Sequence, residues 1–134
     1  MKNDPDDETS GASRNEKLVN RLAMAQATYF VATGVWPLID LRSFEWVSGP
    51  KVDDWLVKTV GIEVAVVGAV LAFATRSKRI TPEIELLAVG NALGLTAIDL
   101  VYVSRRVIRP IYLLDAAIEV GFAAGWLALR HSRP

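Results

Sequence analysis

The sequence predicts an all-α fold, a membrane-embedded four-helix bundle, and the placement of charge carries this prediction. Charged residues make up 22% of the 134 residues, but they gather in the N-terminal tail, the linkers and the C-terminal end. The four apolar stretches between those segments contain only Glu63, Asp99, Asp115 and Glu119. A soluble bundle would carry charges along one face of every helix. Runs of about 20 apolar residues are instead long enough to cross a hydrocarbon core of about 30 Å.

The first helix follows the tail Met1–Ser13, which is acidic, small and polar. Such a segment buries too little apolar area to repay the entropy of ordering, so we expect a disordered tail. Residues 14–134 then form the four-span domain, with the first span at about residues 20–38. Trp36-Pro37 marks its end, because tryptophan favours the membrane interface and proline interrupts a helix.

The longest linker, Leu38–Asp54, separates the first and second spans. Its segment Ser43–Val47 alternates polar and aromatic residues, which suits a short segment lying at the membrane surface. The second span covers about residues 55–75 and begins at Trp55, a further interfacial anchor.

The last two spans, at about residues 84–104 and 110–129, form a hairpin around an arginine-rich turn. Thr81-Pro82 starts the first of them in the manner of an N-cap followed by proline at the first helical position. Each span contains a small-residue motif, Gly90-x-x-x-Gly94 and Gly121-x-x-x-Gly125. These motifs predict that both helices pack closely on neighbours.

An even number of spans places both termini on one side of the membrane. That side carries more lysine and arginine than the other, so the positive-inside rule predicts cytoplasmic termini. The arginines of the last turn, Arg105, Arg106 and Arg109, weigh against this orientation. Their effect on the orientation is smaller if they pair with acids inside the bundle.

The four acids within the spans lie at similar depths. Asp99 and Asp115 are five residues from the nearer end of their stretches, Glu63 eight from Trp55 and Glu119 nine from Pro110. Since successive helices alternate in direction, these distances are measured from the same membrane face. At 1.5 Å per residue the acids occupy one layer about 8–14 Å below that face.

This layer is the candidate site, because a carboxylate inside a span costs about 2.5–3.5 kcal/mol and marks function by default. We expect a polar pocket that binds or moves a small ligand, a cation or a proton. Its predicted residues are Glu63, Asp99, Asp115 and Glu119, with Tyr102, Tyr112, Arg106 and Arg109 at the rim. The alternative is a structural or accessory membrane protein whose buried acids only pair with arginines and set helix packing.

Other classes of function are less favoured. The chain has no cysteine and a single histidine, His131, near its end. We therefore expect no catalytic residues, no metal site and no cofactor, and an enzyme is the least favoured class. The expected partners are the lipid bilayer and a small-molecule or cation ligand, with no nucleic acid. Because four helices are few for a transport path, a transporter would imply a homo-oligomer.

One block of short motifs resembles a family of small, uncharacterised bacterial four-helix membrane proteins. The block runs from Thr33 to Gly61 and includes Thr33-Gly34-Val35-Trp36-Pro37, Arg42-Ser43-Phe44-Glu45, Gly49-Pro50-Lys51, Trp55-Leu56-Val57 and Thr59-Val60-Gly61. The resemblance implies a protein of the bacterial inner membrane and lends no activity. It also suggests that the first linker folds over the mouth of the pocket, with Arg42 or Lys51 facing the acids.

Overall fold

The computed structural model describes residues 5–131, and within them it contains five helices and no strand. The helices are α1 (Pro5–Ile39), α2 (Leu41–Ser48), α3 (Asp54–Arg76), α4 (Pro82–Ser104) and α5 (Tyr112–His131). The predicted all-α fold is confirmed. So is the prediction of four helices long and apolar enough to cross a membrane, namely α1, α3, α4 and α5.

Helix α1 begins at Pro5, well before the predicted start at about residue 14. Most of the tail expected to be disordered is therefore helical, while Met1–Asp4 lies outside the described residues. The expectation of a disordered tail considered only the apolar area that the tail could bury. A helix that is already nucleated extends at little cost per residue, so the end of α1 needs no packing of its own.

The linker between the first two spans contains α2, a helix of two turns. The carboxylate of Asp40 caps it by accepting a hydrogen bond of 3.1 Å from the backbone N–H of Ser43. This bond, together with that from the Ser43 hydroxyl, holds the pKa of Asp40 below its ordinary value. Residues 40–53, called the cap segment below, contain α2 and the turn after it.

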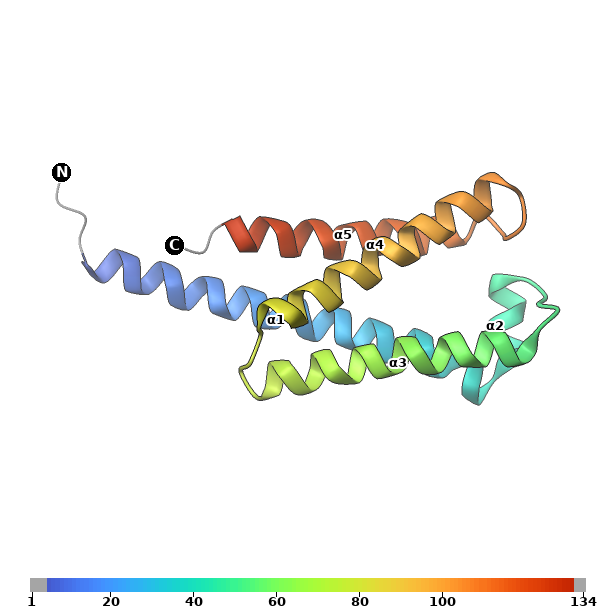
Figure 1. The fold of residues 1–134 in the computed structure, drawn as a ribbon, viewed down its shortest axis with the longest axis horizontal. Helices are drawn as coiled ribbons and strands as arrows, with labels where there is room; N and C mark the ends of the chain where they lie inside the picture. The colour runs from blue at the N-terminus through green and yellow to red at the C-terminus, as the bar shows by residue number, and fades with distance from the viewer. Residues whose placement is uncertain (1–4, 132–134) are drawn as a thin grey trace.

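The helices form two pairs (Figure 1). In one pair α1 packs against α3, and in the other α4 packs against α5. The two described chain ends and the α3–α4 turn lie at one end of the molecule, and α2 and the α4–α5 turn lie at the other. The helices therefore alternate in direction as the sequence predicted.

Contact between α1 and α3 depends on glycine. A Cβ atom added to Gly34 would lie 2.5 Å from the carbonyl oxygen of Gly61, and one added to Gly61 would lie 2.6 Å from the carbonyl oxygen of Gly34. Gly68 is equally close to α1, with the Ala27 carbonyl oxygen 2.9 Å from its would-be Cβ. The two backbones touch directly along this seam, as close-packed membrane helices do.

The predicted role of the two glycine motifs is wrong. A Cβ on Gly90, Gly94 or Gly121 would meet nothing within 4 Å, and only Gly125 approaches a neighbour, the Leu22 side chain. The spacing of these motifs was right for a helix face, but the face points outward. Alanines fill the buried faces of α4 and α5 instead: Ala88, Ala92, Ala116 and Ala123.

A buried amide joins the two pairs. Gln26 of α1 is fully buried; its Nε2 donates to the carbonyl oxygen of Ala88 on α4 at 2.9 Å. Its Oε1 accepts from the indole N–H of Trp126 on α5 at 2.7 Å. Both polar ends of the side chain are thereby satisfied, which a buried amide requires. We call this three-helix contact the Gln26 bridge.

Helices α3 and α4 end in the same way. Lys78 and Arg106 each adopt the left-handed conformation, with φ of 50° and 59°. The N–H of the next residue bonds back to Ala74 in the first case and Tyr102 in the second, at 2.9 Å in both. This is the Schellman arrangement, in which a glycine is usual.

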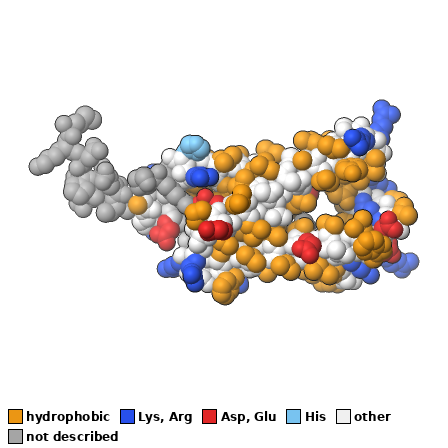
Figure 2. All heavy atoms as spheres, viewed as in Figure 1, with side chains coloured by type: hydrophobic (Ala, Val, Ile, Leu, Met, Phe, Trp, Pro, Cys, Tyr) orange, Lys and Arg blue, Asp and Glu red, His pale blue; other side chains and the backbone are white. Residues whose placement is uncertain are grey.

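Hydrophobic side chains cover the outside of the spans. Large residues such as Ile62, Val66, Phe73, Leu86 and Leu114 are half exposed or more. Figure 2 shows hydrophobic side chains over the middle of the molecule, with lysine and arginine toward its two ends. In a soluble monomer such an apolar surface would be unusually large.

Candidate functional site

Three acids and a tyrosine meet where α1, α4 and α5 come together. Asp115 and Glu119, four residues apart, project from one face of α5, and Asp99 projects from α4. The hydroxyl of Tyr29 on α1 donates a hydrogen bond to Oδ1 of Asp115. The carboxyl groups of Asp99 and Asp115 lie within hydrogen-bonding range of each other, and Glu119 is close to both. We call these four residues the carboxyl cluster.

Two acids of the cluster are buried, Tyr29 and Asp115 are half buried, and the cluster lacks a cation. Glu119 is 1% exposed and Asp99 5%. Glu119 Oε2 and Asp99 Oδ2 have no hydrogen-bond partner, and among the described side chains no lysine or arginine forms an ion pair with the cluster. An unpaired buried charge costs several kcal/mol. Two carboxyl groups this close can share a hydrogen bond only when one of them carries a proton.

The fourth predicted acid, Glu63, does not join the cluster, because its side chain is exposed on α3. At 100° per residue, Glu63 lies about 200° round the helix from Gly61, which faces α1. Depth along the helix was therefore not enough to place this side chain inside the bundle.

The predicted rim residues lie toward the same end but are turned away from the acids. Tyr102 and Arg106 are exposed at the end of α4. Tyr112 is half buried and packs under Lys51, whose Nζ is 4.9 Å from the centre of its ring. Arg109 Nη1 donates to the carbonyl oxygen of Trp46 at 3.3 Å. The arginines thus contact the cap segment and solvent, and the arginine pairing considered for the acids is not formed.

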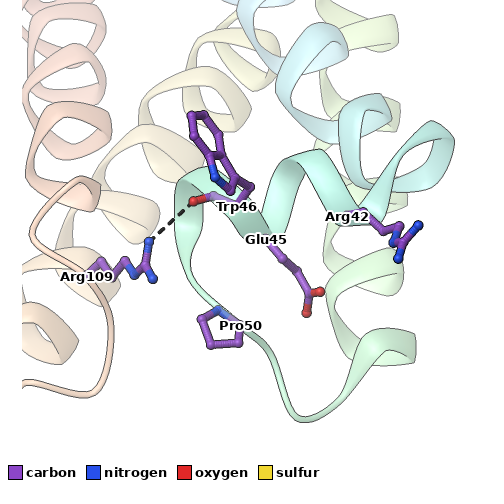
Figure 3. A pocket seen from close by; sticks show the side chains of 5 residues that line it. All are labelled: Arg42, Glu45, Trp46, Pro50 and Arg109. Atoms are coloured by element: carbon purple, nitrogen blue, oxygen red, sulfur yellow. Dashed lines mark hydrogen bonds between the residues drawn. The ribbon is translucent and has the colours of Figure 1, made fainter.

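The cap segment contacts the α4–α5 turn and borders an open hollow of about 460 Å³. The expected approach of Arg42 or Lys51 to the acids is not formed, because Lys51 lies over Tyr112 and Arg42 lines the hollow. Its lining residues are Arg42, Glu45, Trp46, Pro50 and Arg109 (Figure 3). Arg109 reaches toward Trp46, while Arg42 extends to the other side of α2. Oε1 of Glu45 accepts a hydrogen bond of 2.8 Å from the N–H of Lys51. Glycine is needed at position 49, where φ is 96° and the Arg109 side chain packs against the backbone.

Several residues of the site were missed by sequence reasoning. Tyr29 and Gln26 lie in the apolar stretch of the first helix, which contains no acid and was treated as a plain span. Glu85 was placed at the edge of its span, yet it is buried on the same face of α4 as Thr96 and Asp99. The steps of three and four residues from Glu85 to Asp99 through Ala88, Ala92 and Thr96 were the available signal.

Within the described residues, no group of three histidines or acids is arranged to hold a metal ion. Comparison with known proteins adds no assignment: no family model, no curated protein and no solved structure matches this chain.

Proposed function

We propose that this protein is a multi-pass integral membrane protein that takes up and releases protons at the carboxyl cluster. The observation that carries the proposal is Glu119. It is 1% exposed with Oε2 unpartnered, and it lies beside two carboxyl groups within hydrogen-bonding range of each other. Acids inside membrane spans commonly form proton relays.

The proposal that the protein spans a membrane rests on the length of its helices and on their apolar outer surface. Helices α3 and α4 have 23 residues each, about 35 Å at 1.5 Å per residue, which exceeds a hydrocarbon core of about 30 Å. Apart from Glu63 on α3, the middle of their outward faces is apolar, and lysine and arginine lie near both ends of the two helices. By the positive-inside rule the chain termini lie on the cytoplasmic side, in the inner membrane of a bacterium if the resemblance holds.

A proton fits the cluster better than a larger ligand. The groups face one another directly, with Tyr29 bonded to Asp115 and Asp115 within bonding range of Asp99. A hydrated cation would have to separate them. A proton instead replaces the missing counter-charge without any movement of the helices.

The test is proton uptake by the purified protein. Infrared difference spectra across about pH 5 to 9 record the C=O stretch of protonated carboxyl groups, an observable of general acid chemistry. We expect a titrating carboxyl band in the wild type that is reduced in Glu119→Gln. The matched control is Glu63→Gln, which changes an exposed acid at a similar depth.

A wild-type spectrum with no titrating carboxyl band in this range would refute the proposal. So would a band lost equally in Glu63→Gln and Glu119→Gln. If Glu119→Gln changes only the stability of the protein, the acids serve packing, as the structural alternative holds.

A further inference from the structure

The buried polar side chains of this protein are not scattered. Among the residues whose burial is described, they are Gln26, Ser48, Glu85, Thr96, Asp99 and Glu119. All but Ser48, which belongs to the cap segment, come from α1, α4 and α5. They lie on the faces that carry the Gln26 bridge and the carboxyl cluster.

The buried polar residues of α1, α4 and α5, called the polar seam below, extend along most of the length of the bundle. Glu85 and Asp99 lie at opposite ends of the buried face of α4, about 21 Å apart at 1.5 Å per residue. A hollow with polar lining residues lies at each end of the molecule. The first is beside the cap segment, and the second, of about 320 Å³, is beside the α3–α4 turn that leads into α4 and includes Asn15, Asn20 and Lys78 in its lining.

The Gln26 bridge lies between the two acidic ends. On α4 it contacts Ala88, three residues after Glu85 and eleven before Asp99. Both polar ends of the Gln26 amide are committed to bonds of 2.9 Å and 2.7 Å. An amide held in this way does not pass a proton, so the bridge interrupts the seam.

We infer that the seam is a transmembrane proton path, with Glu85 as a second proton-binding residue and the Gln26 bridge as its barrier. The inference rests on the proposed function and extends it from binding to conduction. When the bridge opens, a proton leaves a carboxyl group of the cluster for water that enters the seam. The water passes it to the carboxylate of Glu85, so that one positive charge crosses the barrier. The proton then leaves Glu85 for water at the other face, and the cluster is reprotonated from the cap side.

Proton flux into liposomes tests the path. The purified protein is reconstituted in vesicles that contain a pH-sensitive dye, and a potassium gradient with valinomycin supplies the driving potential. We expect Glu85→Gln to lower the flux by about tenfold or more, as for a residue of a relay. The control is Glu83→Gln, which removes an exposed acid from the same first turn of α4 and should leave the flux unchanged.

The barrier is tested with Trp126→Phe, which removes the N–H that bonds Gln26 and keeps an aromatic ring in the core. We expect a several-fold rise in flux. A flux in Trp126→Phe equal to or below that of the wild type would overturn the assignment of the barrier.

The infrared measurement separates the two proposals. We expect Glu85→Gln to keep the titrating band of the cluster while losing flux. If the cluster titrates but the wild type conducts no protons, or Glu85→Gln conducts as well as Glu83→Gln, the path is refuted and proton binding stands. If the cluster does not titrate, both proposals fail.

Discussion

Helix α1 takes part in two seams that differ in kind. Toward α3 it presents glycine, and the backbones meet at Gly34, Gly61 and Gly68 with no room for a Cβ atom. Toward α4 and α5 it presents Gln26 and Tyr29, which reach across by hydrogen bonds. The first seam depends on shape and has one arrangement. The second depends on protons and hydrogen bonds, which can be exchanged.

The difference follows from what stabilises helices in a bilayer. Lipid chains are as apolar as the side chains, so helices associate through close packing and through hydrogen bonds. The α1–α3 seam uses the first means and the polar seam uses the second. The proposed proton path needs a rigid support beside a seam whose hydrogen bonds can change, and α1 belongs to both.

The largest effect is expected from filling the glycine seam. Gly34→Val places a branched side chain where even a Cβ atom would lie 2.5 Å from a carbonyl oxygen. We expect a loss of about 3 kcal/mol or more in the free energy of unfolding in detergent, since overpacking of this kind forces the backbones apart. Gly90→Val, at a site with nothing within 4 Å, is the control and should cost less than about 1 kcal/mol. Equal losses in the two variants would show that the close packing at Gly34 does not stabilise the α1–α3 pair.

The Gln26 bridge should rank second. Gln26→Leu removes two hydrogen bonds and leaves the indole N–H of Trp126 buried without its partner. We expect a loss of about 1–2 kcal/mol in the free energy of unfolding. In the double variant with Trp126→Phe the two losses should not add, because both remove the same bond. Additive losses would mean that the hydrogen bond between Gln26 and Trp126 does not contribute to the free energy of unfolding.

A smaller effect of opposite sign is expected within the carboxyl cluster. Glu119→Leu replaces a buried acid that has no cation partner by an apolar side chain of similar size. We expect the free energy of unfolding to rise by about 1 kcal/mol, while proton uptake at the cluster is reduced. Glu63→Leu, at an exposed position, should leave proton uptake unchanged. A strongly destabilised Glu119→Leu would indicate that the carboxyl group is held for packing.

The smallest effect concerns the cap of α2 and depends on pH. Because the pKa of Asp40 is lowered by its bonds to Ser43, the cap is fully effective above the ordinary aspartate pKa. It is lost as the pH falls through the lowered value. The protection of the α2 amides, measured as the exchange rate relative to that of an unstructured peptide at the same pH, should therefore fall in acid for the wild type. In Asp40→Ala this protection should be low at every pH, and in Asp40→Asn, where an amide can still cap, it should not depend on the charge. Identical acid profiles in the wild type and Asp40→Ala would contradict this account.

The extent of the spans was predictable from the sequence, because each has at most two charged residues over about the length that a bilayer requires. The depth of the acids was predictable for the same reason, and Asp99, Asp115 and Glu119 do meet. Which face of each helix is buried was not predictable, because in a helix that is apolar all round no periodicity marks the buried side. For this reason Glu63 and the Gly90–Gly94 motif were predicted to face other helices, although both are exposed. Gln26 was interpreted as a mere interruption in an apolar run, although it is fully buried.

The ends of α3 and α4 bear on how deep the cluster lies. Each helix stops at a cation in the left-handed conformation, Lys78 at one end of the molecule and Arg106 at the other. That conformation costs a residue with a side chain about 1–2 kcal/mol, which glycine would avoid. In the proposed bilayer the two positive charges lie at opposite headgroup layers and resist sliding of the bundle in either direction. The distance from water to Glu119 is then set by electrostatic anchoring at these two stops, and changing the thickness of the lipid should strain them before it moves the acids.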